Sequence, residues 1–249
     1  MTKTTLIGAL VVALALIGTG CDSSSTTLEA PTVTHAVTDN GGTLSLTWDA
    51  VSGAESYEIT AGGSVQTTTS TGFEVTTPSA TVEVRAVKGS SKSDPATIDC
   101  RIVESTVEFF GDLELTHANG FGFDSKGSAV ACVLHAQAFD TIDFYAASMG
   151  GGMQLIDASA VTDRKHGNAV KAASGSYDGA TIADPLGAYS DTLAVMADST
   201  YYLRISADTT GTWSTNDNFA KVRVDSIVGE KVNLTTGYQK VEGLRWLVK

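Results

Sequence analysis

The sequence predicts an all-β protein, and three observations support that class. Of its 249 residues, 25 are glycine and only 18% are charged. Long stretches rich in Leu, Lys and Glu, which are typical of helices, are missing. In the first hundred residues, short runs of alternating apolar and polar residues recur roughly every ten residues, a spacing typical of β-sandwiches. We therefore expect one β-sandwich, followed by a second β-sandwich or partly closed barrel with a long irregular insertion.

The N-terminal segment, residues 1–20, has the order of a secretory signal. Lys3 gives a positive start, and the stretch from Leu6 to Ile17 has no charged or polar side chain. The small residues Gly18 to Gly20 then lead to Cys21. A bilayer-spanning helix needs about 20 apolar residues, so this stretch is too short to remain as an anchor. The order predicts a segment that is removed after export.

The junction of Gly20 and Cys21 resembles a bacterial lipoprotein signal. In that family the cysteine thiol receives a diacylglycerol, the signal is cut before it, and the new amino end is acylated, with palmitate for example. The resemblance implies an exported protein that is lipidated at Cys21 and anchored to the bacterial outer membrane or cell surface. Residues 21–29 include a serine-rich run typical of a tether. The alternative is an ordinary signal peptide that is cut nearby, with Cys21 unmodified.

The net charge of −12 bears on the choice of partners. A surface this acidic repels phosphate backbones, so nucleic acid is not an expected partner. Hydrophobic residues make up 42% of the chain, which is enough to bury a core. The expected partners are the membrane, through the lipid, and a glycan or an envelope protein.

The three cysteines are Cys21, Cys100 and Cys132. If Cys21 is lipidated, an even pair remains in an exported chain, and disulfides persist outside the cytosol. We therefore expect a disulfide between Cys100 and Cys132. The alternative is two buried thiols.

Residues 30–100 are expected to form the first sandwich. The run from Thr43 to Trp48 places Leu44, Leu46 and Trp48 on one face and hydroxyl side chains on the other. The other clear runs are Ser56 to Thr60, Phe73 to Val75 and Thr81 to Val87, the last of which is expected to bury Val82, Val84 and Ala86. A boundary is expected between Ile98 and Glu104, where this pattern ends.

The same stretch resembles a fibronectin type III module. The matching residues are Pro31, the L-x-L-x-W run ending at Trp48, the A-x-x-Y-x-I run ending at Ile59, the V-x-V-x-A run ending at Ala86, and the turn from Gly89 to Pro95. The resemblance implies a spacer or docking module. No Arg-Gly-Asp triplet is present, so integrin-type adhesion has no support.

Residues 101–249 are expected to form the second β-rich domain. The expected strands are Val107 to Phe109, Leu113 to Leu115, Ala129 to Leu134, Ile142 to Tyr145, Thr200 to Ile205, Ala220 to Val224, Val232 to Leu234 and Leu244 to Val248. The nearly apolar run from Ala129 to Leu134 predicts a central strand. The runs from Thr200 and from Ala220 are expected to pair with each other. Between the strands, Met149 to Ser199 shows no sustained periodicity, and long loops of this kind often bind ligands.

No set of catalytic residues stands out, so the chain is not expected to be an enzyme. The sequence has no G-x-S-x-G, no H-E-x-x-H, no P-loop and no dinucleotide-binding fingerprint. Its four histidines are scattered, and none has the spacing of a metal-ligand pair. We expect a non-catalytic, lipid-anchored surface protein that binds or docks a partner through its C-terminal domain.

The C-terminal half resembles, faintly, the β-rich domain of HmuY-like surface lipoproteins. The similar stretches are Gly122 to Asp124, Asp143 to Tyr145, Tyr201 to Arg204, Phe219 to Val224, and Tyr238 with Gln239. Some of those proteins bind haem through His or Met side chains, so haem or metal capture is the alternative function. The chain's own candidates for such a ligand site are Met149, Met153 and His166. Trp213 is the candidate for stacking on a glycan. No other cofactor and no dedicated metal site are expected.

Overall fold

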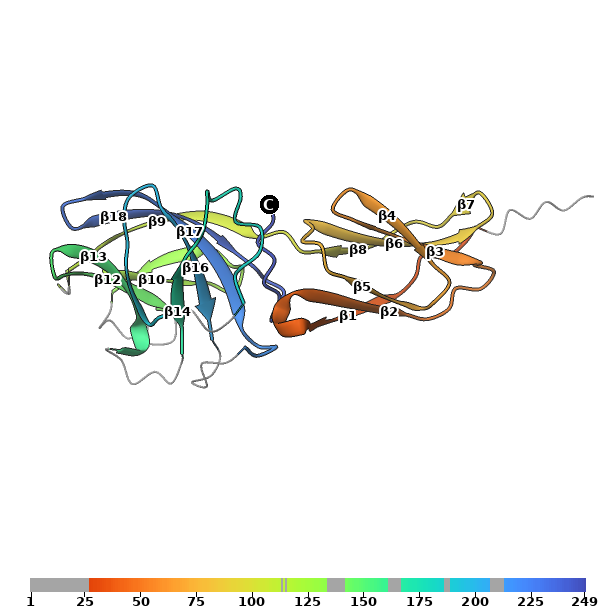
Figure 1. Ribbon diagram of the computed structural model, residues 1–249, viewed down its shortest axis with the longest axis horizontal. Helices are drawn as coiled ribbons and strands as arrows, with labels where there is room; N and C mark the ends of the chain where they lie inside the picture. Colours follow the sequence, from red (N-terminus) through yellow and green to blue (C-terminus); the bar gives the residue numbers. More distant parts are fainter. Residues whose placement is uncertain are drawn as a thin grey trace, which may run out of the picture.

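The computed structural model of the chain describes residues 27–112, 114, 116–133, 142–160, 167–185, 189–206 and 213–249. Figure 1 shows two β-rich units placed end to end along the longest axis. The all-β prediction is confirmed, since the strands form four antiparallel sheets in sandwich-like arrangements. Within the described residues none of these sheets closes into a barrel, and no helix is long and apolar enough to cross a membrane.

The first unit, here called the N-terminal sandwich, consists of two sheets. Their strands are β1 (Val33–Thr38), β2 (Thr43–Trp48), β3 (Ser56–Ala61), β4 (Ser64–Thr68), β5 (Gly72–Val75), β6 (Thr81–Lys88), β7 (Ser91–Lys92) and β8 (Ala96–Asp99), with the 3-10 turn η1 (Asp39–Gly41) between β1 and β2. One sheet has the order β1-β2-β5, and the other has the order β4-β3-β6-β7 with β8 also paired to β6.

The core of this sandwich follows the alternation of its sequence. Leu44 and Leu46 of β2 and Val82 and Val84 of β6 are almost completely buried, while the residues between them are more exposed. Trp48 lies in the same cluster and contacts the ring of Tyr57 edge to face, at 5.2 Å between centroids. The predicted core positions are therefore confirmed.

The second unit, here called the C-terminal sandwich, also has two sheets. Its elements are β9 (Val103–Phe110), β10 (Gly120–Phe123), β11 (Ala129–Cys132), β12 (Phe144–Met149), β13 (Gly152–Asp157), η2 (Ala158–Ala160), β14 (Ala169–Ala172), β15 (Thr192–Ala194), β16 (Thr200–Ile205), β17 (Asn218–Val228) and β18 (Lys231–Tyr238). The sheet orders are β11-β10-β12-β13-β15 and β14-β16-β17-β18-β9. Apolar residues of both sheets, such as Phe121 and Phe144 from one and Leu203 and Val222 from the other, form one buried cluster.

Two expectations for the strands of the C-terminal half need correction, and one is confirmed. The run from Ala129 is an edge strand, β11, and Val130 is 47% exposed, because a strand at the end of a sheet needs no cover on its outer side. The stretch 149–199 is not one long loop: β13, β14 and β15 lie in it, although its residues 161–166 and 186–188 fall outside the described part. The predicted pairing of Thr200–Ile205 with the strand around Ala220 is confirmed.

The last expectation to correct concerns the C-terminal segment, residues 239–249. It was expected to end the chain as a strand of the second domain, but in the structure it returns to the junction of the two sandwiches. Leu244 and Trp246 are fully buried in the same cluster as Leu44 and Trp48 of β2. The core of the N-terminal sandwich is thus completed by residues from the end of the chain.

Candidate functional site

The junction of the two sandwiches is built around the left-handed turn η1. Asp39, Asn40 and Gly41 have φ angles of 51°, 47° and 85°, a conformation that costs roughly 1–2 kcal/mol for a residue with a side chain. Asn and Asp tolerate it better than most residues because their short side chains can bond to the local backbone. A Cβ atom on Gly41 would collide with the carbonyl oxygen of Gly243 and lie 2.7 Å from Cγ of Arg245. This position therefore requires glycine.

Arg245 joins the turn to the C-terminal segment. Its side chain is 6% exposed, and its Nε donates a hydrogen bond to the carbonyl oxygen of Asn40 at 2.6 Å. Another guanidinium nitrogen donates to the carbonyl oxygen of Ala183, and the backbone N–H of Arg245 donates to Gly41 at 2.9 Å. Burial lowers the pKa of Arg245 from its usual value, but the group stays charged at any physiological pH. The carbonyl oxygens replace the water that this cation has lost.

Gln239 makes a second connection between the two sandwiches. Its side chain has no exposed surface, and its Nε2 donates to the carbonyl oxygens of Cys100 at 2.8 Å and Trp246 at 2.7 Å. Its Oε1 accepts from the backbone N–H of Val241 at 2.9 Å. One amide thus fixes both the connection between the sandwiches and the start of the C-terminal segment.

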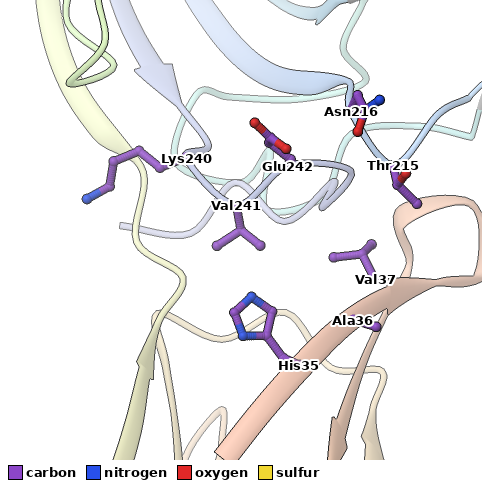
Figure 2. A pocket seen from close by; sticks show the side chains of 8 residues that line it. All are labelled: His35, Ala36, Val37, Thr215, Asn216, Lys240, Val241 and Glu242. Atoms are coloured by element: carbon purple, nitrogen blue, oxygen red, sulfur yellow. The ribbon is translucent and has the colours of Figure 1, made fainter.

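A cleft of about 620 Å³, here called the junction cleft, opens beside these contacts. It is lined by His35, Ala36 and Val37 of β1, Thr215 and Asn216 from the turn before β17, and Lys240, Val241 and Glu242 of the C-terminal segment. Figure 2 shows that the side chains of His35 and Val37 point toward the part of the C-terminal segment that contains Val241. The volume lies within the range of about 300–1,000 Å³ that is typical of ligand sites.

The lining of the junction cleft combines an apolar floor with exposed polar residues. Val37 and Val241 are half-buried and supply an apolar floor, while the other six lining residues are exposed. Lys240 and Glu242 place opposite charges two residues apart on one wall. The lining contains no serine or cysteine. Among the residues that the structure describes, no group of three His, Cys, Asp or Glu side chains is placed to hold a metal ion.

The residues predicted as ligand candidates do not come together in the described part of the chain. Met149, at the end of β12, is 52% exposed, whereas Met153 on the neighbouring β13 is 7% exposed and belongs to the buried core. A Cβ atom on Gly111 would overlap with the thioether of Met153, which shows how tightly Met153 is packed. His166 and the lipidation candidate Cys21 lie outside the described residues.

Trp213 lies near the junction but is not an open stacking platform. Its indole Nε1 donates to the carbonyl oxygen of Gly243 at 3.0 Å, and its ring packs beside the buried cluster that includes Phe219 and Leu247. The tryptophan predicted for glycan binding thus supports the C-terminal segment from the inside. Trp48 and Trp246, which were predicted to be core residues, are 6% and 0% exposed.

The predicted disulfide is not seen in the structure: no bond joins Cys100 and Cys132, although both lie in the described part of the chain. Cys100 is buried in the core of the N-terminal sandwich, and Cys132 belongs to a different cluster at the edge strand β11. A disulfide requires that the two Cα atoms lie within about 7 Å of each other. The expectation of a bond was based on the even number of cysteines, which says nothing about this distance. Burial raises the pKa of the Cys100 thiol to about 12, which keeps it protonated.

Sequence reasoning missed the junction cleft. Its two walls, His35 to Val37 and Lys240 to Glu242, are about 200 residues apart in the chain and share no motif. The one local signal was the run from Asp39 to Gly42, whose residue types favour a left-handed turn. That signal predicts a turn and does not show what packs against it.

Comparisons with known proteins add a fold similarity. No protein-family model matches the chain, and no curated protein sequence matches it. Among solved structures, the chain is similar to a DUF4466 family protein from Parabacteroides merdae ATCC 43184, with a TM-score of 0.43 and 10% identity over 86% of this chain and 99% of that chain. It is also similar to chitinase ChiA74 from Bacillus thuringiensis, with a TM-score of 0.25 and 14% identity over 89% of this chain and 28% of that chain. At these scores neither similarity bears on the chemistry of the site.

Proposed function

We propose that this chain is a non-catalytic lipoprotein of the bacterial outer membrane or cell surface that docks an envelope protein in the junction cleft. The observation that supports this most is that both sandwiches build the cleft and that Arg245 fixes them to each other. A cleft with fixed walls loses little conformational freedom on binding, and this favours affinity. The proposal moves the binding site from the stretch 149–199 to the junction.

The position of the anchor supports the proposal. Leu28 follows the proposed lipidation site Cys21 by seven residues in the sequence. It lies at the end of the N-terminal sandwich where β2 leads into β3, since its Cδ2 would be 4.0 Å from a Cβ atom added to Gly53 in that loop. The turn η1 and the cleft lie at the other end of β2. A strand of six residues spans about 20 Å, so the cleft would stand away from the membrane.

The lining of the junction cleft favours a protein partner over a glycan. None of its eight lining residues is Phe, Tyr or Trp, so a sugar ring would find no large apolar ring to stack on. The nearby indole N–H of Trp213 is already bonded to Gly243. A protein segment, in contrast, can use the valine floor for apolar side chains and the charged rim for polar ones.

The anchor is tested with Cys21→Ser. The variant should move from the membrane fraction to the soluble fraction and lose incorporation of labelled palmitate, because the thiol is the proposed acceptor. Protease added to intact cells should degrade the wild-type chain if it lies on the surface. Equal palmitate labelling of Cys21→Ser would contradict the anchor.

The cleft is tested by filling it. Thr215 is exposed and lines the cleft from the C-terminal sandwich, so Thr215→Trp should block entry and leave the fold intact. The full chain in detergent micelles, labelled with a fluorophore, should bind to cells that lack its gene, and Thr215→Trp should weaken this binding at least tenfold. The matched control is Val65→Trp, at an exposed position of β4 away from the cleft. Equal binding by Thr215→Trp and the wild type would refute docking in the cleft.

A further inference from the structure

We propose that the partner occupies the junction cleft as an extended peptide that adds a strand to the outer edge of β1. This inference rests on the proposed function and specifies how the cleft recognises its ligand. It follows from the direction of the backbone groups of β1, from the lack of edge protection on that strand, and from the apolar floor formed by Val37 and Val241.

The register of the sheet shows which backbone groups of β1 are available. Trp48 of β2 donates its N–H to Thr71, on the side of β5, at 3.0 Å. In an antiparallel ladder the N–H and C=O of one residue point to the same side, and successive residues alternate. Trp48 therefore does not exchange hydrogen bonds with its partner on β1, Val33. By alternation, Val33, His35 and Val37 direct their N–H and C=O groups away from β2.

These outward groups have no partner strand among the described residues, since β1 is the edge of its sheet. His35 and Val37 both line the junction cleft, so their backbone donors and acceptors border the same space as their side chains. Ala36 also lines the cleft, although its side chain lies on the opposite face of the sheet. The cleft therefore extends from the inner face of β1 to its edge, where an added strand would lie about 4.8 Å away.

β1 lacks the features that usually protect an edge strand. It contains no proline, lysine or acidic residue, and its six residues pair with β2 without a bulge. The edge strand β9 of the other sandwich, in comparison, has Glu104 and Glu108, and Lys249 and Lys231 pair with them. Proteins normally block open edges because such edges recruit other strands. An unprotected edge that borders a cleft is a template for an added strand.

The facing wall specifies the chemistry of the peptide. In an extended segment, alternate side chains point to one side, so one set would rest on the floor formed by Val37 and Val241. Figure 2 shows that Val241 points toward His35, whereas the side chains of Lys240 and Glu242 point away from β1 and flank this floor. We therefore expect a partner segment with small apolar residues at alternate positions. The turn η1 and Arg245 keep the two walls at a fixed separation.

The experiment removes a single backbone donor from the edge. Val37→Pro deletes an N–H that points outward, and proline is tolerated at an edge position whose N–H faces solvent. A displayed library of random ten-residue peptides is selected against the wild-type full chain in detergent micelles. The recovered peptides should show the alternating pattern, and their affinity for Val37→Pro should fall at least tenfold. Val37→Ala truncates the same side chain of the floor but keeps the backbone N–H, so it measures the side-chain contribution, and the affinity for Val37→Pro should be at least tenfold lower than the affinity for Val37→Ala.

Two further measurements make the outcome decisive. The melting temperature of Val37→Pro must lie within a few degrees of the wild-type value. If it does not, the test uses N-methylated versions of the selected peptides and the wild-type chain instead. These peptides lack alternate backbone N–H donors and should lose binding. Recovery of no peptide, or peptides that bind Val37→Pro as well as the wild type, would overturn strand addition. If cell binding is lost in Thr215→Trp but kept in Val37→Pro, docking in the cleft stands and only strand addition fails.

Discussion

The side chain of Arg245 donates a hydrogen bond to the carbonyl oxygen of Asn40 at 2.6 Å and thereby joins positions that are 205 residues apart in the chain. Asn40 belongs to the N-terminal sandwich, and Arg245 belongs to the C-terminal segment that follows β18 and is almost fully buried at the junction. A buried cation requires polar partners, and the carbonyl groups of Asn40 in the turn η1 and of Ala183 in the C-terminal sandwich supply them. The junction therefore behaves like a folded core, and the relative position of the sandwiches depends on it.

Substitution of Gly41 tests this junction. Gly41→Ala should lower the free energy of unfolding by about 2–4 kcal/mol, because the new Cβ meets Gly243 and Arg245 and because the positive φ is strained. The matched control is Gly63→Ala, at a similar φ of 77° with no atom within 4 Å of the new Cβ, which should lose only about 1–2 kcal/mol. Urea unfolding measures both. Equal losses in the two variants would show that the junction is not tightly packed.

Truncation of Trp246 tests whether the end of the chain completes the N-terminal core. Trp246→Ala should cost about 3–5 kcal/mol, as expected for a large buried side chain. Hydrogen exchange should speed up in β2, which packs against this residue, and stay slow in β17. Val248→Ala, at a half-buried position two residues further on, serves as control and should cost less than about 1 kcal/mol. Unchanged protection of β2 in Trp246→Ala would contradict the prediction.

The strands of this fold could be predicted wherever one face is buried and the other exposed. The range Thr43–Trp48 of β2 and the range Thr200–Ile205 of β16 match the predicted runs residue for residue. Alternation fails as a guide at Ala129, because an apolar run does not tell an edge strand from a central one. It fails again at Trp246, where an apolar run packs as an irregular segment into another unit's core.

The junction cleft could not be predicted because it depends on long-range packing. His35 and Lys240 are unremarkable in the sequence, and they face one space only because Gln239 and Arg245 direct the C-terminal segment back to the N-terminal sandwich. The disulfide, which the structure does not show, was inferred without this information, since the number of cysteines says nothing about the distance between two of them. The alternation of apolar and polar residues indicates which face of a strand is buried. Which residues pack against that face depends on how distant segments of the chain are arranged.

The two buried thiols give a direct chemical prediction. In the full chain with Cys21→Ser, a thiol reagent should react slowly with the folded protein, because burial raises the pKa of Cys100 to about 12 and only the thiolate reacts. After denaturation without a reductant, Cys100 and Cys132 should both be alkylated, which mass spectrometry detects as two additions. Alkylation that appears only after treatment with a reductant would show a disulfide in the exported protein.

Lys221, on β17, occupies an unusual position for a cation. It is 1% exposed, and its Nζ donates to the carbonyl oxygens of Tyr177 at 2.8 Å and Ala180 at 3.1 Å. The ammonium also lies 4.6 Å from the centroid of the Tyr177 ring, and Lys249 lies 5.0 Å from the same centroid. Burial, with a further contribution from the charge of Lys249, lowers the pKa of Lys221 from 10.5 to about 8.

This lowered pKa predicts how stability depends on pH. Below pH 8 the folded chain must bury the charged ammonium of Lys221, which the unfolded chain keeps hydrated. Between pH 8 and 10 the folded chain loses the proton of this ammonium, whereas the unfolded chain retains it. The free energy of unfolding of the wild type, taken relative to Lys221→Met, should therefore rise by at most about 2 kcal/mol from pH 8 to pH 10. Cys100 and the buried tyrosines, whose raised pKa values reduce stability at high pH, are common to both proteins and cancel in the difference. Urea unfolding at half-unit pH steps measures the difference, and parallel curves would mean that the two carbonyl groups and the tyrosine ring fully compensate for the buried charge.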